Sequence, residues 1–466
     1  MTKNIAVAQT VKHPNPKEQV DLVDVVELLH KHITKSLCAK IFRQNRTVER
    51  QRKWTMHALA EFWIAVVLRA PKALTQALEE GSGGRNKFWP GANSSPEAFF
   101  EKCKDFHWSF FGRLYVEFGS RITGEAPCAY NACAAGLRRH FPEIWAMDGS
   151  QLAKVAHRLK ILWKVKGAVL PGRIFVLYDI FRGISRGMVF EPDAAKNEHL
   201  LAKEGLKIIP EGTLILGDRL FGLASYFKIM SERKLWGLLR RHGNTKVKVI
   251  RVLGRGQGER EYLEDSLVSA GCGATIEAQT LRYIRYRKGK ALLELFTNVL
   301  DTDKLSARQA VELYRLRWSI ERMFFDLKAV LNLNHFYAAN PNAIAMQVFA
   351  SAIVYNAFRV AQSLIAVRHG IAPELLSSAK LYPKLAAASD AIAQSEVMWE
   401  GTLDANPGIE LRKPGYKDRP FATTTLGAIL ADKRKKRHVR ARYKPRSTWL
   451  SWRKIRGGRK LLRKLS

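Results

Sequence analysis

Two aspartates stand at the ends of short apolar runs that are typical of buried strands. Asp148 ends the run IWAMD and Asp218 ends the run LILGD, and a turn-forming segment follows each of them. In open α/β sheets, functional groups gather just beyond the strand ends, where an acid can reach a ligand while the residues before it stay buried. An aspartate in this place can also simply form the turn. Taken singly, each aspartate is better explained as a turn former.

A third acid, Glu321, lies in a segment with helical periodicity from about residue 306 to residue 330. At about 100° per residue, four polar or charged residues share a stripe about 60° wide: Tyr314, Arg317, Glu321 and Lys328. A second stripe is apolar and should face a core: Leu313, Leu316, Ile320, Met323 and Leu327. The polar stripe could be an ordinary solvated face, but Trp318 and Phe325 beside it are poor solvent residues. We therefore expect the stripe to face a site.

Three carboxylates from distant segments suggest a site for a hard cation. Asp148, Asp218 and Glu321 would repel one another if they converged, and each would raise the pKa of the others. One or two Mg²⁺ ions would relieve this repulsion, because Mg²⁺ prefers oxygen ligands. Paired ions of this kind activate a nucleophile and stabilise the leaving oxygen in phosphodiester chemistry. Tyr314, Arg317 and Lys328 could then hold DNA phosphates beside the metal.

These residues carry a resemblance to a known family. The spacing of Tyr314, Arg317, Glu321 and Lys328 matches Y-(two)-R-(three)-E-(six)-K, the signature of DDE transposases of bacterial insertion sequences of the insertion-sequence-four type. MDGS at 147–150 and GDRLFG at 217–222 look like the family's two Asp motifs, and the Gly-rich, β-like region at about 243–290 looks like its insertion. The resemblance covers roughly residues 140–335.

The resemblance implies an RNase H-like mixed α/β fold with a β-rich insertion. It also implies two Mg²⁺ ions, for which Mn²⁺ can substitute, held by the catalytic residues Asp148, Asp218 and Glu321. Such enzymes cleave the ends of their element and join them to target DNA, often through a hairpin, and a homodimer in a synaptic complex is expected to hold the two terminal repeats. Arg219 beside the second Asp is a further candidate DNA contact, although a structural salt bridge explains it equally well.

Two rival functions remain open at this stage. A structure-specific nuclease on the same fold would cleave DNA without strand transfer. A non-catalytic DNA-binding protein derived from a transposase would do neither. Among other acids, Asp179 in IFVLYDI is a rival for the site. Asp193, Glu198 and His199 open a predicted helix, where helix capping explains the acids.

The texture of the chain predicts its organisation. A helical region at 1–125, with basic residues that suggest binding to element ends, precedes an RNase H-like domain at 126–340. A helical region follows at 341–430 and a basic tail at 431–466. Within the domain, five runs are predicted strands: EIWAMDG, GRIFVLYDI, GMVFEP, GTLILGD and LWGLLRR. KVKVIRVL and TLRYIRYR are strand candidates in the insertion, from which LLELFTNVL returns to the main sheet.

Charge and composition agree with this interpretation. The formal net charge of +36 and the pI near 10.2 favour a polyanionic partner. The tail has sixteen Lys or Arg and one acid, Asp432; with Trp449 and Trp452 it suggests contact with DNA or with a partner. Scattered cysteines and the lack of a visible secretory signal favour a bacterial cytoplasmic, nucleoid-associated protein. The apolar stretch from Ala343 to Phe358 is short for a membrane span and should be a buried helix, so no membrane partner is expected.

Overall fold

The structure is a computed structural model that describes residues 13–22, 28, 31–44, 54–82, 95–152, 172–194, 196–258, 261–271, 277–338, 340–388 and 423–432. The chain divides into one unit of residues 1–430 and a second of residues 431–466. Apart from Ala431 and Asp432, the basic tail lies outside the described residues, and so does the segment 83–94 between the first helices.

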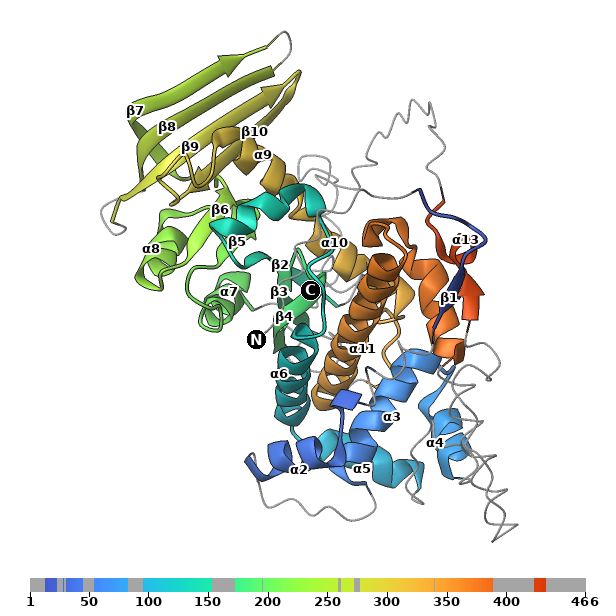
Figure 1. Ribbon diagram of the computed structural model, residues 1–466. Coiled ribbons are helices and arrows are strands. Elements are labelled where there is room, and N and C mark those ends of the chain that lie inside the picture. Colours follow the sequence, from blue (N-terminus) through green and yellow to red (C-terminus); the bar gives the residue numbers. More distant parts are fainter. Residues whose placement is uncertain are drawn as a thin grey trace, which may run out of the picture. The chain divides into compact units, whose positions relative to one another are not determined.

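The five strands predicted around the two aspartates are all present, and they lie in one mixed sheet (Figure 1). Their spatial order is β4-β3-β2-β5-β6, with β3 antiparallel to both of its neighbours and with β2, β5 and β6 parallel. The predicted RNase H-like α/β fold is therefore confirmed. The bounds are β2 Ile144–Gln151, β3 Arg173–Asp179, β4 Ile184–Glu191, β5 Leu214–Gly217 and β6 Trp236–Arg240.

The predicted β-rich insertion continues this sheet. After β6 the order runs β10-β9-β8-β7, and every neighbouring pair is antiparallel. In Figure 1 these long strands extend the sheet away from the helices around α11. Their bounds are β7 Lys246–Gln257, β8 Glu261–Gly271, β9 Gln279–Lys288 and β10 Ala291–Thr297.

Alternation along the strands gives the sheet two buried faces. On β2, Ile144 and Ala146 join one hydrophobic core and Trp145 and Met147 join the other. The first core contains α6, α10 and α11, and the second contains α7 and α8. These helices are α6 Ser109–Thr123, α7 Glu198–Leu206, α8 Ala224–Glu232, α10 Trp318–Phe325 and α11 Pro341–Arg368.

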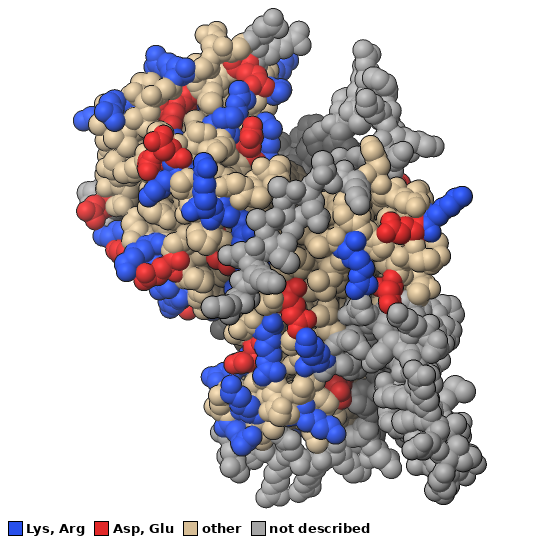
Figure 2. Space-filling view, viewed as in Figure 1, with Lys and Arg blue, Asp and Glu red and all other residues tan. Residues whose placement is uncertain are grey.

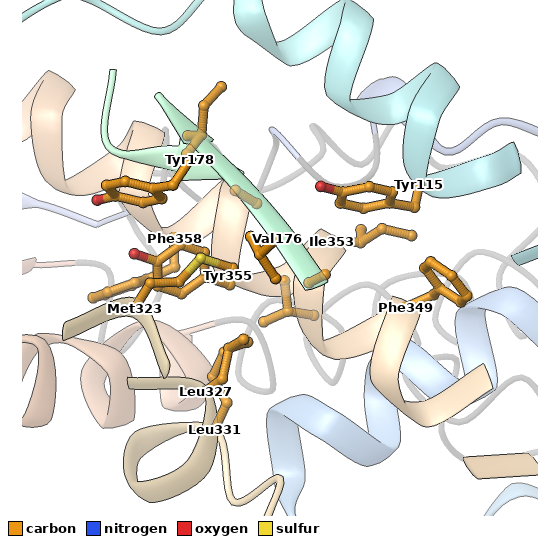
Figure 3. Packing of buried hydrophobic residues seen from close by; sticks show 14 of the residues in the cluster. Tyr115, Val176, Tyr178, Met323, Leu327, Leu331, Phe349, Ile353, Tyr355 and Phe358 are labelled. Carbon is orange, nitrogen blue, oxygen red and sulfur yellow. The ribbon is translucent and has the colours of Figure 1, made fainter. Parts of the chain in front are cut away.

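The helix α11 is the centre of the first core. It is long and apolar enough to cross a membrane by length and composition, but its apolar window is fully buried within the protein. Figure 3 shows Tyr355 and Phe358 of α11 beside Met323 and Leu327 of the segment that carries Glu321, with Val176 of β3 close by. The prediction of a buried core helix is confirmed, and this packing fixes the Glu321 segment against the sheet.

The N-terminal region is helical, as predicted, and its helices also join the first core. They are α2 Lys35–Gln44, α3 Met56–Arg69, α4 Leu74–Ser82, α5 Pro96–Asp105 and the 3₁₀ segment η1 Ala132–Arg139. A short strand β1 (Gln19–Asp21) pairs with β11 (Thr423–Thr425), which leads into α13 (Leu426–Ile429), and a 3₁₀ turn η6 (Pro373–Leu375) follows α11.

Candidate active site

The sheet register places the two aspartates side by side. β2 and β5 are parallel, and their last aligned pair is Met147 with Gly217. Asp148 is the next residue of β2, and Asp218 directly follows β5. The strand end and turn predicted at Asp148 are wrong, because β2 continues through Gln151 in pairing with β3. Asp148 Oδ1 accepts a hydrogen bond from the Gly149 amide at 2.9 Å. Asp218 does begin a turn, and its Oδ1 accepts a hydrogen bond from the Leu220 amide at 2.8 Å.

The predicted long helix is present, but it is broken. Its first part, α9 (Ala307–Arg315), begins at a capping box in which Ser306 and Gln309 bond each other's backbone amides. The chain then tightens, since the amides of Leu316 and Arg317 bond carbonyls three residues back, and α10 starts again at Trp318. A π-helical turn, η5 (Asp326–Val330), ends the segment. These irregularities turn individual side chains of the polar stripe toward β2.

Arg317 connects the helix to the strand. Its Nη1 donates to Asp148 Oδ2 at 3.3 Å, and its Nη2 donates to Glu321 Oε1 at 2.6 Å. Asp148 lies on the α10 side of the sheet, because it shares its face with Ala146. The guanidinium is buried, with 9% of the residue exposed. The Arg317 guanidinium thus binds the carboxylates of Asp148 and Glu321 at the same time.

Lys328 reaches the same end of β2. Its Nζ donates to Ser150 Oγ at 2.6 Å and to the Gln151 carbonyl at 2.7 Å. Ser150 lies two residues after Asp148 on the same face of the strand. The structure therefore places Arg317, Glu321 and Lys328 of the stripe around the first Asp motif.

The other two candidate DNA contacts behave differently. Tyr314 is buried, with its ring 6.0 Å from the Arg317 guanidinium, and burial raises the pKa of its hydroxyl to about 12. Arg219 begins the 3₁₀ turn η4 (Arg219–Phe221) directly after Asp218 and is exposed, with no salt bridge to any described carboxylate. The structural salt bridge that we considered for Arg219 is absent from the described residues.

The expectation that Trp318 and Phe325 avoid solvent is wrong, because 66% and 62% of their surfaces are exposed. Trp318 directly follows Arg317 and Phe325 lies four residues after Glu321, so both border the polar stripe on a solvent-facing side of the segment. The evidence that the polar stripe faces a site is therefore its contacts with β2, and not the burial of neighbouring residues.

Asp148 has a strongly perturbed carboxyl group. Burial raises its pKa to about 7, and repulsion from Asp218 and Glu198 adds to the rise, while Arg317 and the Gly149 amide oppose it. An ordinary aspartate titrates near 4. A carboxyl group with this environment gains much from an added cation.

The comparisons with known proteins agree with this geometry. Residues 142–357, which contain all the residues just described, match the family described as Transposase DDE domain. This segment is similar to DDE transposase domains. Its bounds take in the RNase H-like sheet, the insertion and most of α11.

The relatives have low identity and only partial overlap. A protein of Synechocystis described as a candidate transposase for insertion sequence element IS4SA is 24% identical over 46% of this chain and 58% of the relative. The candidate transposase y4zB of Sinorhizobium fredii is 25% identical over 39% of this chain and 54% of the relative. The chain thus spans about half the length of these relatives. A solved piggyBac transposase synaptic complex with hairpin DNA is similar with a TM-score of 0.39 and 11% identity, over 84% of this chain and 83% of that one.

The carboxylates of the DDE domain suit a hard divalent cation by their chemistry. Within the described ranges, no three His, Cys, Asp or Glu side chains are close enough to hold a metal ion together. The Arg317 guanidinium lies between Asp148 and Glu321. All the donors are carboxylate oxygens, and Asp148 and Asp218 repel each other, so the donor set fits Mg²⁺.

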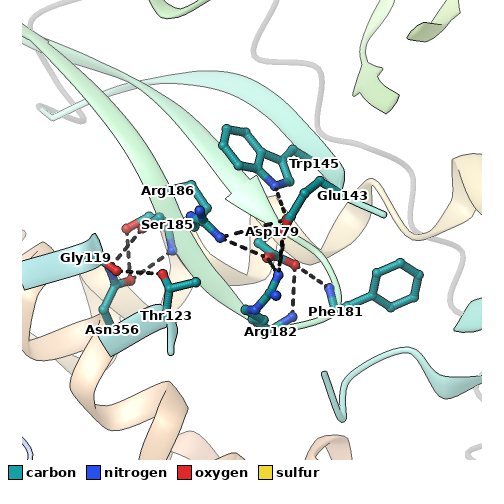
Figure 4. A network of polar contacts seen from close by, with 10 residues as sticks. All are labelled: Gly119, Thr123, Glu143, Trp145, Asp179, Phe181, Arg182, Ser185, Arg186 and Asn356. Atoms are coloured by element: carbon teal, nitrogen blue, oxygen red, sulfur yellow. Dashed lines mark hydrogen bonds and ion pairs between the residues drawn. The ribbon is translucent and has the colours of Figure 1, made fainter. Parts of the chain in front are cut away.

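Asp179, the rival acid, lies away from these groups. It is aligned with Trp145 at the start of β2, three residues or about 10 Å before Asp148. Its Oδ2 is 2.8 Å from Arg182 and 3.7 Å from Arg186. Figure 4 shows that Glu143 completes this network, since it pairs with Arg182 and accepts a hydrogen bond from the Trp145 indole. Asp179 is therefore a structural acid.

Glu198 is the residue at this site that the sequence did not reveal. Burial raises the pKa of its carboxyl, with repulsion from Asp218 in addition, against the effects of Arg173 and the Gly149 amide. We had attributed this acid to helix capping. The only available signal was that it opens the helix just before the strand that ends at Asp218.

Proposed function

We propose that the chain is a DNA transposase that cleaves the ends of an insertion sequence and joins them to target DNA. One observation carries the proposal: in a segment that matches the DDE transposase domain, Asp148 on β2 and Asp218 just after the parallel strand β5 lie side by side, beneath the α10–η5 segment that supplies Glu321, Arg317 and Lys328. This combination provides acidic ligands for cations next to basic groups for phosphates.

Asp148, Asp218 and Glu321 are the proposed catalytic residues and metal ligands. Bound Mg²⁺, or Mn²⁺ in its place, would supply an activated nucleophile and a stabilised leaving oxygen. Arg317 must exchange its carboxylate partners for a phosphate, which a guanidinium can bind in the same bidentate manner. Tyr314 lies beside the Arg317 guanidinium and would position it. Lys328 and Arg219 would place further positive charge along the DNA.

In the proposed reaction, water attacks the phosphodiester at the element end and frees a 3′-hydroxyl. This hydroxyl then attacks either the opposite strand, which gives a hairpin, or the target DNA. Joining two ends to one target requires that both be held together, so we propose a homodimer as the synaptic unit. Figure 2 shows Lys and Arg side chains over much of the visible face, mixed with acids and not gathered in one patch. This distribution, with the net charge of +36, suits a protein that follows long DNA in the bacterial cytoplasm.

The decisive experiment measures Mg²⁺-dependent cleavage and joining of DNA that carries the terminal repeats. Asp148→Ala, Asp218→Ala and Glu321→Ala should each abolish cleavage, while Glu204→Ala on the exposed side of α7 should leave it intact. Thermal unfolding of each variant verifies that it is folded. Intact cleavage in any of the three acidic variants would contradict the assignment.

A second substrate separates the rival functions. A pre-cleaved end with a free 3′-hydroxyl should be joined to a target plasmid by the wild-type chain. Cleavage without joining would indicate a structure-specific nuclease. Binding of the terminal repeats with neither reaction would indicate a non-catalytic DNA-binding protein.

A further inference from the structure

Glu198 does not cap α7. The capping position belongs to Asn197, whose side-chain oxygen accepts a hydrogen bond from the His199 amide at 2.9 Å. Glu198 is the first helical residue, and an acid there gains modestly from the helix dipole wherever its side chain points. The direction of this side chain therefore requires a different explanation.

The Glu198 carboxylate lies directly against the backbone of the first Asp motif. A Cβ atom added to Gly149 would be only 2.4 Å from Glu198 Oε1 and 2.5 Å from its Cδ. Gly149 is not among the glycines with positive φ, so backbone conformation does not demand a glycine here. A side chain at this position would instead have to displace the Glu198 carboxylate. The glycine that follows Asp148 thus allows an acid from another element to approach Asp148.

This acid is stabilised by the Gly149 amide and by one distant cation. Its described salt-bridge partner is Arg173 on β3, at 3.8 Å, and Arg173 Nη1 also donates to the Lys196 carbonyl at 2.7 Å. The nearby acid Glu191, which is also largely buried, is in close contact with the Lys196 ammonium. A carboxylate at the domain's acidic centre with so distant a cationic partner favours a further positive ligand.

Glu198 and Glu321 approach Asp148 from opposite faces of the sheet. α7 packs in the second core through Leu201 and Leu206, and α10 packs in the first core through Ile320 and Met323. Asp148 faces the α10 layer, on the part of β2 that extends past the end of β5. A helix on each face of the sheet therefore brings one carboxylate toward the first Asp motif, which suits two cations better than one.

We propose that Glu198 is a fourth carboxylate of the cation site and that it shares one divalent cation with Asp148. Glu321 serves the other cation from the α10 side. This assignment rests on the proposed function, because it presumes that Asp148 and Asp218 bind divalent cations.

The test is a titration of Mn²⁺ against the full chain, followed by electron paramagnetic resonance of the free ion, without DNA. The wild-type chain should bind two ions. Glu198→Gln, which keeps the size of the side chain, should weaken the binding of one of the two ions at least tenfold. The matched control is Glu204→Gln, whose exposed carboxylate on the same helix pairs with Lys207; it should titrate like the wild type.

Two further variants make the outcome decisive. If Glu198→Gln titrates like the wild type while Asp148→Asn loses Mn²⁺, the inference about Glu198 is wrong and the proposed function stands. If Asp148→Asn also binds Mn²⁺ like the wild type, the proposed cation site itself is wrong. Gly149→Ala should displace the Glu198 side chain and weaken the binding of the same ion. Combining it with Glu198→Gln should cause no further loss of affinity. Equal, additive losses from the two changes would instead indicate a general disturbance of β2.

Discussion

The sheet carries two groups of acids on neighbouring strands, and their surroundings are opposite. Asp179 at the end of β3 and Glu143 before β2 are matched by Arg182 and Arg186. Asp148, farther along β2, faces Asp218 and Glu198 and shares one guanidinium, that of Arg317, with Glu321. Both groups are substantially buried, so burial alone does not distinguish them.

The difference shows how a structural acid and a candidate ligand can be told apart. Around Asp179, two arginines and two backbone amides satisfy the carboxylate within its own protein. Burial raises the pKa of both carboxyl groups, but Asp179 has two arginines against one nearby acid, whereas Asp148 has one arginine against Asp218 and Glu198, and its pKa rises to about 7. A fold tolerates such repulsion where a ligand will relieve it. The candidate site is therefore the group of acids around Asp148, whose negative charge is not compensated, and not the larger polar network around Asp179.

The largest expected effect on stability comes from the compensated group. Asp179→Ala leaves Arg182 and Arg186 without their buried partner, so the free energy of unfolding should fall by about 3–5 kcal/mol. Urea unfolding followed by circular dichroism measures it. Glu204→Ala removes only an exposed ion pair with Lys207 and should cost less than about 1 kcal/mol. Equal losses in the two variants would mean that the Asp179 network does not stabilise the fold.

At Asp148, whose negative charge is not compensated, removal of the carboxylate should raise the free energy of unfolding instead of lowering it. Asp148→Asn removes a carboxylate whose charge is unfavourable in the folded chain, so at pH 8 in EDTA it should stabilise the protein by on the order of 2 kcal/mol. The folded pKa of Asp148, about 7, lies above its unfolded value. The penalty is therefore complete above pH 7 and disappears as the pH falls toward 4. Unfolding curves at pH 8 and pH 4 should show the gain shrinking, whereas a loss of stability at pH 8 would contradict the electrostatic argument.

Much of this contrast could be predicted from the sequence, for a physical reason. Apolar runs that end in Asp148 and Asp218 follow from the burial of the strands, and the family spacing adds Glu321. Glu198 could not be identified in this way, because its role depends on the close approach of α7 to Gly149. Acids at helix starts are common for reasons of capping alone.

Two other features escaped prediction because tertiary contacts override local pattern. The strand β8 carries Asp265, an acid that the sequence analysis did not single out. It is buried against the fully buried Arg282, whose Nη1 also donates to the Leu305 carbonyl just before α9. The same segment also departs from the regular α-helix on which the stripe was drawn, at the break at Leu316 and Arg317 and at the π-helical turn that contains Lys328. Both follow from the need to reach β2 and not from helix propensity.

Cation binding should depend on pH in a way that reflects the raised pKa of Asp148. Protons and Mn²⁺ compete for the same carboxylate, so below about pH 7 the affinity of the wild-type chain should fall by about tenfold per pH unit. Above pH 8 it should be constant. Titrations from pH 5.5 to 8.5 test this, with Asp148→Asn as the variant in which the remaining affinity should lose that slope. A flat profile for the wild-type chain down to pH 5.5 would contradict the raised pKa of Asp148.

The smallest effect concerns the arginines that follow the two kinds of aspartate. Arg182 is bound to Asp179 at 2.8 Å, whereas the exposed Arg219 beside Asp218 has no described carboxylate partner. If Arg219 contacts DNA phosphate, Arg219→Gln should weaken DNA binding a few-fold for every sequence and lower the slope of log affinity against log salt by about 1. Fluorescence anisotropy over a series of salt concentrations measures both. Lys207→Gln, at the far end of α7 and paired with Glu204, removes the same charge and should leave the slope unchanged. An equal change in both variants would mean that net charge alone acts on the DNA, and an unchanged slope for Arg219→Gln would remove Arg219 from the proposed interface.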